Sequence, residues 1–409
     1  MRPILESFHI RVERLHRLCS KLRRVRFRFS LTLVWLCLLT GVSWGQVAPQ
    51  IPKKPIAVVH STPELNEIRL LFRQGMYHHI IERATIALDK AGKPAAEFLY
   101  WRGYARRQIS LLDEARADLE PLGDITGWAT LPSAKALAAE VDALIALRPP
   151  HQHDIRDGDK VVFRVYYEEE SSFLTNVIDS LPKGYKAAST FTGEQTEGVP
   201  VFVFGEWRYE RFVQLMTAYS KKPPRLWWRI LSHAGAIFVS QRNQIGESFK
   251  ADYAYLPVLF SHEMTHLLTR SVLGNPRDFP NWFSEGMARC AEAVYLPSFI
   301  AQNDRTIQQL LAKNAILPLD QLASSNALQT AVDNQKGGTQ NSDAYAQSYN
   351  MTRYLQSLLN GKKMPYFIVL MRDKEGFSGA LKQETGMTID EFYQSWLKAI
   401  DSPDNHFEQ

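Results

Sequence analysis

Two histidines and a glutamate in one short segment have the types and the spacing of a metal site. Residues 262–266 read His-Glu-Met-Thr-His within a stretch, 255–274, that we predict to be one helix. Residues four apart on a helix leave the same face, so His262 and His266 are able to bind one metal ion. Glu263 is displaced around the helix, which leaves it free to act as general base on a water molecule beside that ion.

A catalytic zinc site needs a third protein ligand and keeps its fourth position open. Glu285 is the candidate, because it lies 19 residues after His266 in the opening turns of a second helix. We expect that helix to begin at Asn281, a good N-cap residue. Two antiparallel helices joined by a short loop would bring Glu285 level with both histidines. The sequence therefore predicts one Zn²⁺ per chain.

The second helix also carries a family resemblance. The run Trp-x-x-Glu-Gly-x-Ala at residues 282–288, after an HExxH motif, resembles the gluzincin zinc metallopeptidases. The resemblance is greatest to the peptidase MA-like domains of exported bacterial proteins, and it covers roughly residues 160–400. The ending Gly-x-Thr-x-Asp-Glu-Phe-x-x-x-Trp at 386–396 resembles the same group. Arg289 stands where thermolysin-like chains would have an aspartate, so the thermolysin pattern itself does not fit.

The resemblance implies a zinc metallopeptidase acting on a peptide or protein, with His262, His266 and Glu285 as ligands and Glu263 as general base. Glu292 matches a carboxylate that supports a ligand histidine in the aminopeptidases, although a surface glutamate explains it equally well. Strand 235–240 resembles the edge strand on which gluzincins lay an extended substrate.

Two tyrosines are candidates for the donor that stabilises the oxyanion in the transition state. Tyr345 and Tyr349 lie in a later segment, where related enzymes often place a tyrosine or histidine. Core packing explains both as readily. The polar stretch 333–343 before them is predicted to be a loop over the site.

A structural metal site is the alternative to a catalytic one. Structural zinc favours four protein ligands, often cysteines, and Cys290 lies on the predicted second helix but points away from Glu285. The competing function is therefore a non-catalytic binding or scaffold protein with a structural zinc domain. The retained Glu263 favours catalysis, since a structural site has no use for it.

The elements around the motif predict an α+β chain of several domains. Residues 62–150 are helical, and two similar copies 35 residues apart resemble tetratricopeptide repeats, with a plain helical bundle as the alternative. Such repeats would offer a surface for a protein partner. A zincin-like metallopeptidase domain is predicted over 158–402, with a small mixed sheet (strands 161–167, 199–204 and 235–240) and a mostly helical C-terminal part. The segment 151–154 reads as a polar loop.

Charge is concentrated at the N-terminus. Residues 1–28 carry nine Lys or Arg against two Glu, a local charge of +7, which leaves −2 for the rest of a chain whose total is +5. The remainder is near neutral, so we predict no nucleic-acid partner.

An uncharged apolar stretch follows the basic segment, as in a signal peptide. Ser43 and Gly45 are small residues suited to cleavage before Gln46, and the apolar run is a little short of the ~20 residues that span a bilayer. We predict that residues 1–45 are removed, that 46–61 form a linker, and that the protein is exported to the periplasm, cell envelope or medium. An uncleaved membrane anchor is the alternative, and only then is membrane contact expected.

Cleavage predicts a mature chain that starts near Gln46 and retains Cys290 as its single cysteine. Mass spectrometry of the protein from its native envelope checks this. A start within residues 1–10 would instead show that the apolar segment is an anchor.

Overall fold

The computed structural model describes residues 56–57, 62–92, 95–127, 130–219, 230–241, 255–274, 278–324, 327–328, 343–374 and 376–401. The predicted signal peptide and all but the last residue of the polar loop 333–343 lie outside them. The chain divides into two compact units, Met1–Lys54 and Pro55–Gln409, and every described element belongs to the second. Within the described part, no helix has both the length and the apolar character needed to cross a membrane.

The described chain begins with five helices that pack in sequence order, here called the helical array. They are α2 (Pro63–Gln74), α3 (Tyr77–Ala91), α4 (Ala96–Gln108), α5 (Leu112–Leu119) and α6 (Ala134–Leu147). A short parallel pair, β1 (Ile56–Ala57) with β2 (Ile125–Thr126), ties part of the predicted linker to the array.

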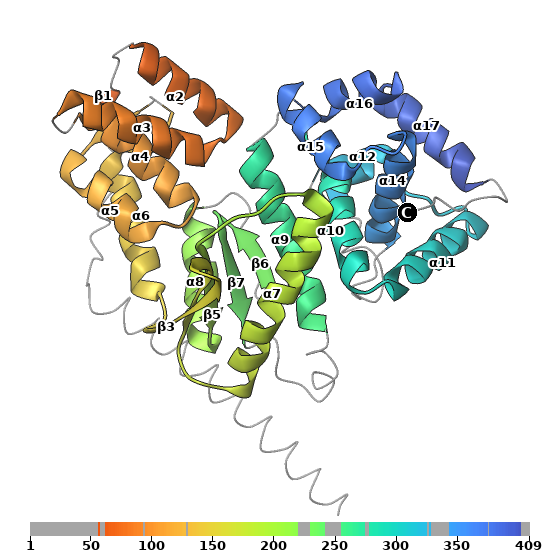
Figure 1. The fold of residues 1–409 in the computed structure, drawn as a ribbon, viewed down its shortest axis with the longest axis horizontal. Coiled ribbons are helices and arrows are strands. Elements are labelled where there is room, and N and C mark those ends of the chain that lie inside the picture. The colour runs from red at the N-terminus through yellow and green to blue at the C-terminus, as the bar shows by residue number, and fades with distance from the viewer. Residues whose placement is uncertain are drawn as a thin grey trace, which may run out of the picture. The chain divides into compact units, whose positions relative to one another are not determined.

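A five-stranded mixed sheet follows, in the order β3-β4-β5-β7-β6 (Figure 1). The strands are β3 (His151–Asp157), β4 (Lys160–Tyr167), β5 (Val199–Phe204), β6 (Ile230–His233) and β7 (Ala236–Ser240). The three central strands run parallel, and the outer strands β3 and β6 are antiparallel to their neighbours. The sheet is therefore open, with β6 at one edge.

Strict alternation along the central strands gives the sheet two different faces. Valine and isoleucine side chains on one face form a core with α7 (Ser172–Thr192) and α9 (Leu256–Leu273). Aromatic side chains on the other face form a core with α8 (Glu206–Tyr219) and the helical array, as in Phe202, Phe204 and Phe238. The array and the sheet thus share one apolar core, while the boundary predicted between two domains near residue 150 stays a prediction.

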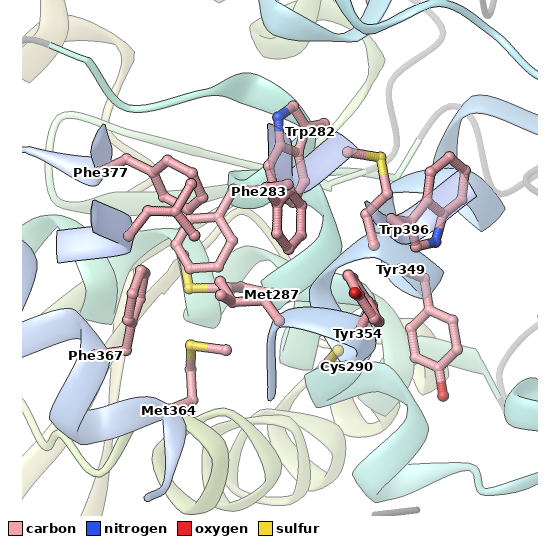
Figure 2. Packing of buried hydrophobic residues seen from close by; sticks show 14 of the residues in the cluster. Trp282, Phe283, Met287, Cys290, Tyr349, Tyr354, Met364, Phe367, Phe377 and Trp396 are labelled. Carbon is pink, nitrogen blue, oxygen red and sulfur yellow. The ribbon is translucent and has the colours of Figure 1, made fainter. Parts of the chain in front are cut away.

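The C-terminal part of the described chain is helical. Its elements are α10 (Asn281–Tyr295), α11 (Ser298–Ala312), α12 (Leu319–Ala323), α14 (Asp343–Leu358), α15 (Met364–Asp373), α16 (Phe377–Thr385) and α17 (Ile389–Ile400). Figure 2 shows its aromatic core, where Trp282 stacks on Phe392 at 5.7 Å between ring centroids. Trp396 donates its indole N–H to Asn350 at 2.8 Å, so the polar atom of this buried ring is paired.

The α+β class with a small mixed sheet is confirmed, but three local predictions are wrong. Residues 151–154 are not a loop, because their polar side chains belong to a solvent-facing outer strand that pairs with β4. The strand predicted at 235–240 is not an edge, since β6 covers it. We missed β6, a strand of four residues joined to β7 by a two-residue turn.

His233, the last residue of β6, links this sheet to the helical array and to α9. Burial, followed by the charges of Arg107 and Arg270, lowers the pKa of His233 from 6.5 to about 4. The folded protein therefore holds His233 neutral where the unfolded chain binds a proton, so acid destabilises the fold between about pH 6.5 and 4. We expect His233→Gln to lose less stability than the wild type across this window in urea unfolding. His79→Gln, at an exposed histidine, is the control. If His233→Gln and the wild type lose the same stability in acid, the attribution of this pH dependence to His233 is wrong.

Candidate metal centre

Helix α9 forms as its sequence predicts. Pro257 lies in the first turn, where a missing backbone N–H leaves no bond unmade. Arg270 lies in the last turn, and Gly274 ends the helix with a positive φ of 63°. Most of the helix is buried between α7, α10 and the sheet, so the direction of its histidine face is fixed by the core.

Helix α10 packs against α9 and runs antiparallel to it. The pairing shows this direction, because His262 in the second turn of α9 contacts Glu292 near the end of α10, while His266 contacts Ser284 near its start. The predicted N-cap is wrong by one residue, because Asn281 is the first residue of the helix and Pro280 is its N-cap. Gly286 allows α14 to approach α10, because a Cβ there would overlap the backbone of Ser348.

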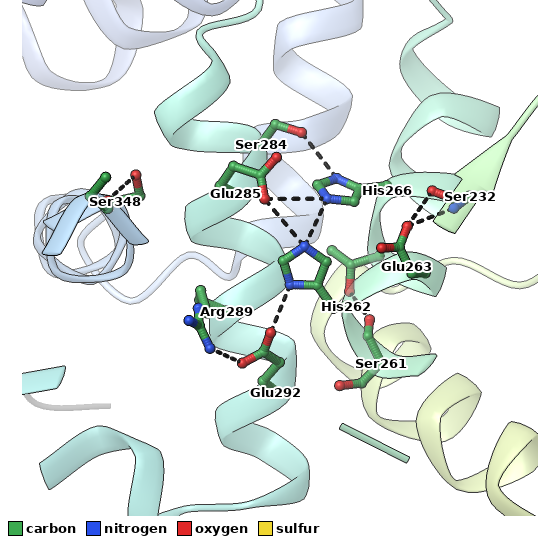
Figure 3. Close-up of polar contacts among 12 residues, drawn as sticks. Ser232, Ser261, His262, Glu263, His266, Ser284, Glu285, Arg289, Glu292 and Ser348 are labelled. Atoms are coloured by element: carbon green, nitrogen blue, oxygen red, sulfur yellow. Dashed lines mark hydrogen bonds and ion pairs between the residues drawn. The ribbon is translucent and has the colours of Figure 1, made fainter. Parts of the chain in front are cut away.

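His262, His266 and Glu285 converge on one point between these helices (Figure 3). The two histidine Nε2 atoms are 3.2 Å apart, and Glu285 Oε2 lies 3.2 Å from the first and 3.6 Å from the second. The three side chains are 13 to 16% exposed, so the group is largely enclosed yet still reached by solvent. The triad can hold a metal ion, and among the described residues it is the one group of at least three His, Cys, Asp or Glu with this geometry.

Outer contacts hold each imidazole in place. Glu292 Oε1 lies 2.7 Å from His262 Nδ1, and Arg289 donates to the other oxygen of that carboxylate at 2.6 Å. Ser284 Oγ lies 3.1 Å from His266 Nδ1. Both Nδ1 atoms are thus engaged, which turns both Nε2 atoms towards Glu285. Glu292 is buried, so the structure places it against the triad and not on the surface.

The electrostatics of the site suit a cation. Burial would lower the pKa of His262, but hydrogen bonds and charge from Glu285 and Glu292 raise it to about 10. Burial would raise the pKa of Glu285, yet His266 and His262 hold it well below its usual range. The pKa of Glu292 is lowered too, because Arg289 and His262 outweigh its burial. Two ionised carboxylates and Arg289 therefore surround His262, and a bound metal ion would supply the positive charge that a proton on this imidazole otherwise brings.

Glu263 stands off the triad and faces the edge strand. Its Oε2 accepts two hydrogen bonds from Ser232 on β6, one from the backbone N–H at 2.7 Å and one from the hydroxyl at 2.8 Å. Figure 3 shows this carboxylate on the side of α9 away from Glu285. Ser232 was not among the predicted site residues, and its signal is the Ala234-Gly235 turn that makes a hairpin of β6 and β7.

The two candidate tyrosines have different surroundings. The ring of Tyr345 lies 6.4 Å from that of His262, with the Arg289 guanidinium 5.1 Å from its centroid. Burial, followed by the charge of Glu285, raises the pKa of Tyr345. Tyr349 lies in the C-terminal core (Figure 2). It is 1% exposed, and the Arg353 guanidinium lies over its ring. Cys290 is buried in the same core, where its thiol lies 3.9 Å from Gln356 Oε1.

Comparison with known proteins adds no assignment, since no protein-family model, curated protein or solved structure matches the chain.

The triad predicts that metal binding depends on three side chains and is tuned by a fourth. We expect His262→Ala and His266→Ala to lose nearly all bound metal, measured by elemental analysis of the purified protein. Glu292→Ala should retain the ligands but weaken metal affinity by roughly 10- to 100-fold, the usual effect of losing a carboxylate that orients a histidine ligand. Exposed Glu120→Ala is the control. Full metal retention in both histidine variants would refute the site.

Proposed function

We propose that this protein is a zinc metallopeptidase that hydrolyses peptide bonds in a peptide or protein substrate. The observation that carries the proposal is the pairing of a two-histidine, one-carboxylate triad with a separate carboxylate, Glu263, from the same helix. A structural metal site has no need of that fourth group. The likeness of the motifs to the gluzincins and to peptidase MA-like domains supports the same conclusion.

The donor set and its spacing favour zinc among the common metals. Two imidazoles and one carboxylate are a frequent catalytic zinc set, with a fourth position left open. Tetrahedral zinc with bonds of ~2.0–2.1 Å separates its ligand atoms by about 3.3 Å. The three separations here, 3.2, 3.2 and 3.6 Å, agree with that figure. Calcium and magnesium prefer sites made of oxygen ligands, which this one is not.

When bound, the zinc ion supplies a Lewis acid that polarises the substrate carbonyl and makes a water molecule more acidic. Glu263 accepts the proton from that water as it attacks and can pass it to the leaving amine. Ser232 contributes by holding one carboxylate oxygen of Glu263, which leaves the other for the water. Glu292 and Ser284 fix the histidines, so the base and the ligands keep one relative geometry.

Tyr345 is the proposed donor to the oxyanion that develops on the substrate carbonyl. Its ring lies beside His262 at the edge of the triad, and its raised pKa keeps the hydroxyl protonated and able to donate. Tyr349 is surrounded by the C-terminal core, which favours a packing role for it. Export from the cytoplasm and a protein partner on the helical array remain parts of the proposal that rest on the sequence.

Glu263→Gln separates an enzyme from a binding protein. The amide keeps size and polarity and leaves the triad unchanged, so zinc content and unfolding midpoint should equal the wild type. Loss of the proton acceptor should reduce hydrolysis of unfolded protein substrates at least about 100-fold, within the usual range for a general base.

Glu120→Gln, which alters an exposed carboxylate in the helical array, is the matched control and should cleave at the wild-type rate. A Glu263→Gln variant that cleaves as fast as the wild type would show that Glu263 is not the base. A wild type that binds zinc but cleaves no member of a broad substrate library would favour a non-catalytic role.

A further inference from the structure

Two turns of the helical array touch the two elements that carry the site. The α2–α3 turn includes Gln74 and Gly75, and the α4–α5 turn includes Ile109 and Ser110. Gly75 and Ser110 are 35 residues apart, so they occupy equivalent places in successive helix pairs. Both have left-handed backbone, with φ of 71° and 58°. The repeat thus presents the same kind of turn twice on one side of the array.

The second of these turns holds the β6–β7 hairpin. Ser110 Oγ donates to the carbonyl oxygen of Ala234 at 2.7 Å. Gly235 lies directly against Ile109, because a Cβ built on it would come within 2.7 Å of the Ile109 Cα. Leu231 on β6 is buried in the same apolar core as the array. A hydrogen bond, a backbone contact and an apolar core therefore fix the hairpin on the array.

The first turn meets the end of the metal helix. A Cβ built on Gly274, the residue that ends α9, would overlap the carbonyl of Gln74 and approach Gly75. Gly274 has φ of 63° and ψ of −124°, which suits glycine almost alone. The backbone of the α2–α3 turn thus contacts the backbone of Gly274, so the array determines where α9 ends.

Local strain supports a role beyond packing. Ala234 has φ of 48°, at a hairpin position that usually takes asparagine or aspartate followed by glycine. Ser110, its partner, is also a non-glycine residue in left-handed backbone. Such conformations persist where the surroundings impose them, and they gather at functional sites. Two strained residues joined by one hydrogen bond indicate that the hairpin is held in place by the array.

The β6–β7 hairpin also contacts the candidate general base, Glu263. Ser232, which binds Glu263, is two residues before Ala234 on a strand of four residues. Alternation along β6 sends Ser232 towards α9 and His233 towards the array. A displacement of the turn is therefore passed to Ser232 through one short stretch of backbone.

We propose that the α4–α5 turn of the helical array positions the general base, with Ser110 as the positioning residue acting through Ala234, β6 and Ser232. The α2–α3 turn provides the matching support under α9. Through these two turns the array then positions the site, in addition to any surface it offers to a partner. This inference rests on the proposed function, because it names the element that regulates the geometry of the same site.

Ser110→Gly tests the inference with little risk to folding, since glycine suits left-handed backbone and only the hydroxymethyl group is lost. We expect faster hydrogen–deuterium exchange in peptides covering 230–240, because β6 loses its anchor. Turnover per bound zinc should fall roughly fivefold, equivalent to about one hydrogen bond, with KM and zinc content nearly unchanged. Ser110→Asn, which tolerates the backbone and keeps a donor, should recover part of the loss.

Asn360→Gly is the matched control, because Asn360 has φ of 51° at an exposed turn between α14 and α15. It should leave exchange in 230–240 and turnover at wild-type values. If Ser110→Gly behaves like this control in both measurements, the positioning role is wrong. The exchange experiment needs no catalysis, so an inactive wild type would refute the proposed function while the anchoring of β6 is still decided.

Discussion

The antiparallel packing of α9 on α10 is the constraint on which the site depends. One helix supplies His262 and His266, the other supplies Glu285, and neither can form the triad alone. The separation of the two helices fixes the separations of the ligand atoms, which lie within 4.8 Å of one another. Both helices are largely buried on their other sides, so the cores of the sheet and of the C-terminal helices determine this separation.

The same packing gives the charged groups around the triad different neighbours. On the α10 side, Arg289 and Glu292 form a buried pair that holds an imidazole from behind. On the sheet side, Ser232 holds Glu263 away from the triad. In the proposed function, three glutamates therefore take three roles, as ligand, as support and as base, because each has different neighbours. In the proposed mechanism this separation keeps the proton acceptor out of the metal's ligand positions.

The candidate site was predicted from the sequence because its residues lie close together along the chain, on two consecutive helices. Helical spacing alone puts His262 and His266 on one face, and a short connection to the next helix brings in Glu285. The distance from His262 to Glu292 follows from the same two helices. Ser232 could not be found in this way, since it reaches Glu263 by a contact between β6 and α9 that joins residues 31 apart in the sequence.

Some elements of the fold were predicted better than others, again because a sequence pattern reports mainly on local structure. Long helices and buried apolar strands have strong periodicity, so α9 and the central strands were predicted within about two residues. Outer strands such as β3 and β6 have polar or very short sequences, and pairing with a neighbour defines them. Helix α7 continues past Pro182 to Thr192, although proline usually ends or bends a helix, so its full length is not evident from the sequence alone. The array and the sheet share one core, but no local sequence pattern indicates this, because the residues involved lie far apart in the chain.

X-ray absorption at the zinc edge of the purified protein is a direct test of the triad as a zinc site, because it identifies the ligand types without requiring activity. We predict about one zinc per chain, bound by two imidazole nitrogens and by oxygen, with bonds of ~2.0–2.1 Å and no sulfur. The spectrum of Glu263→Gln should be closely similar. A zinc–sulfur distance of ~2.3 Å, which would require a cysteine ligand, or the absence of bound zinc would show that this triad is not the zinc site.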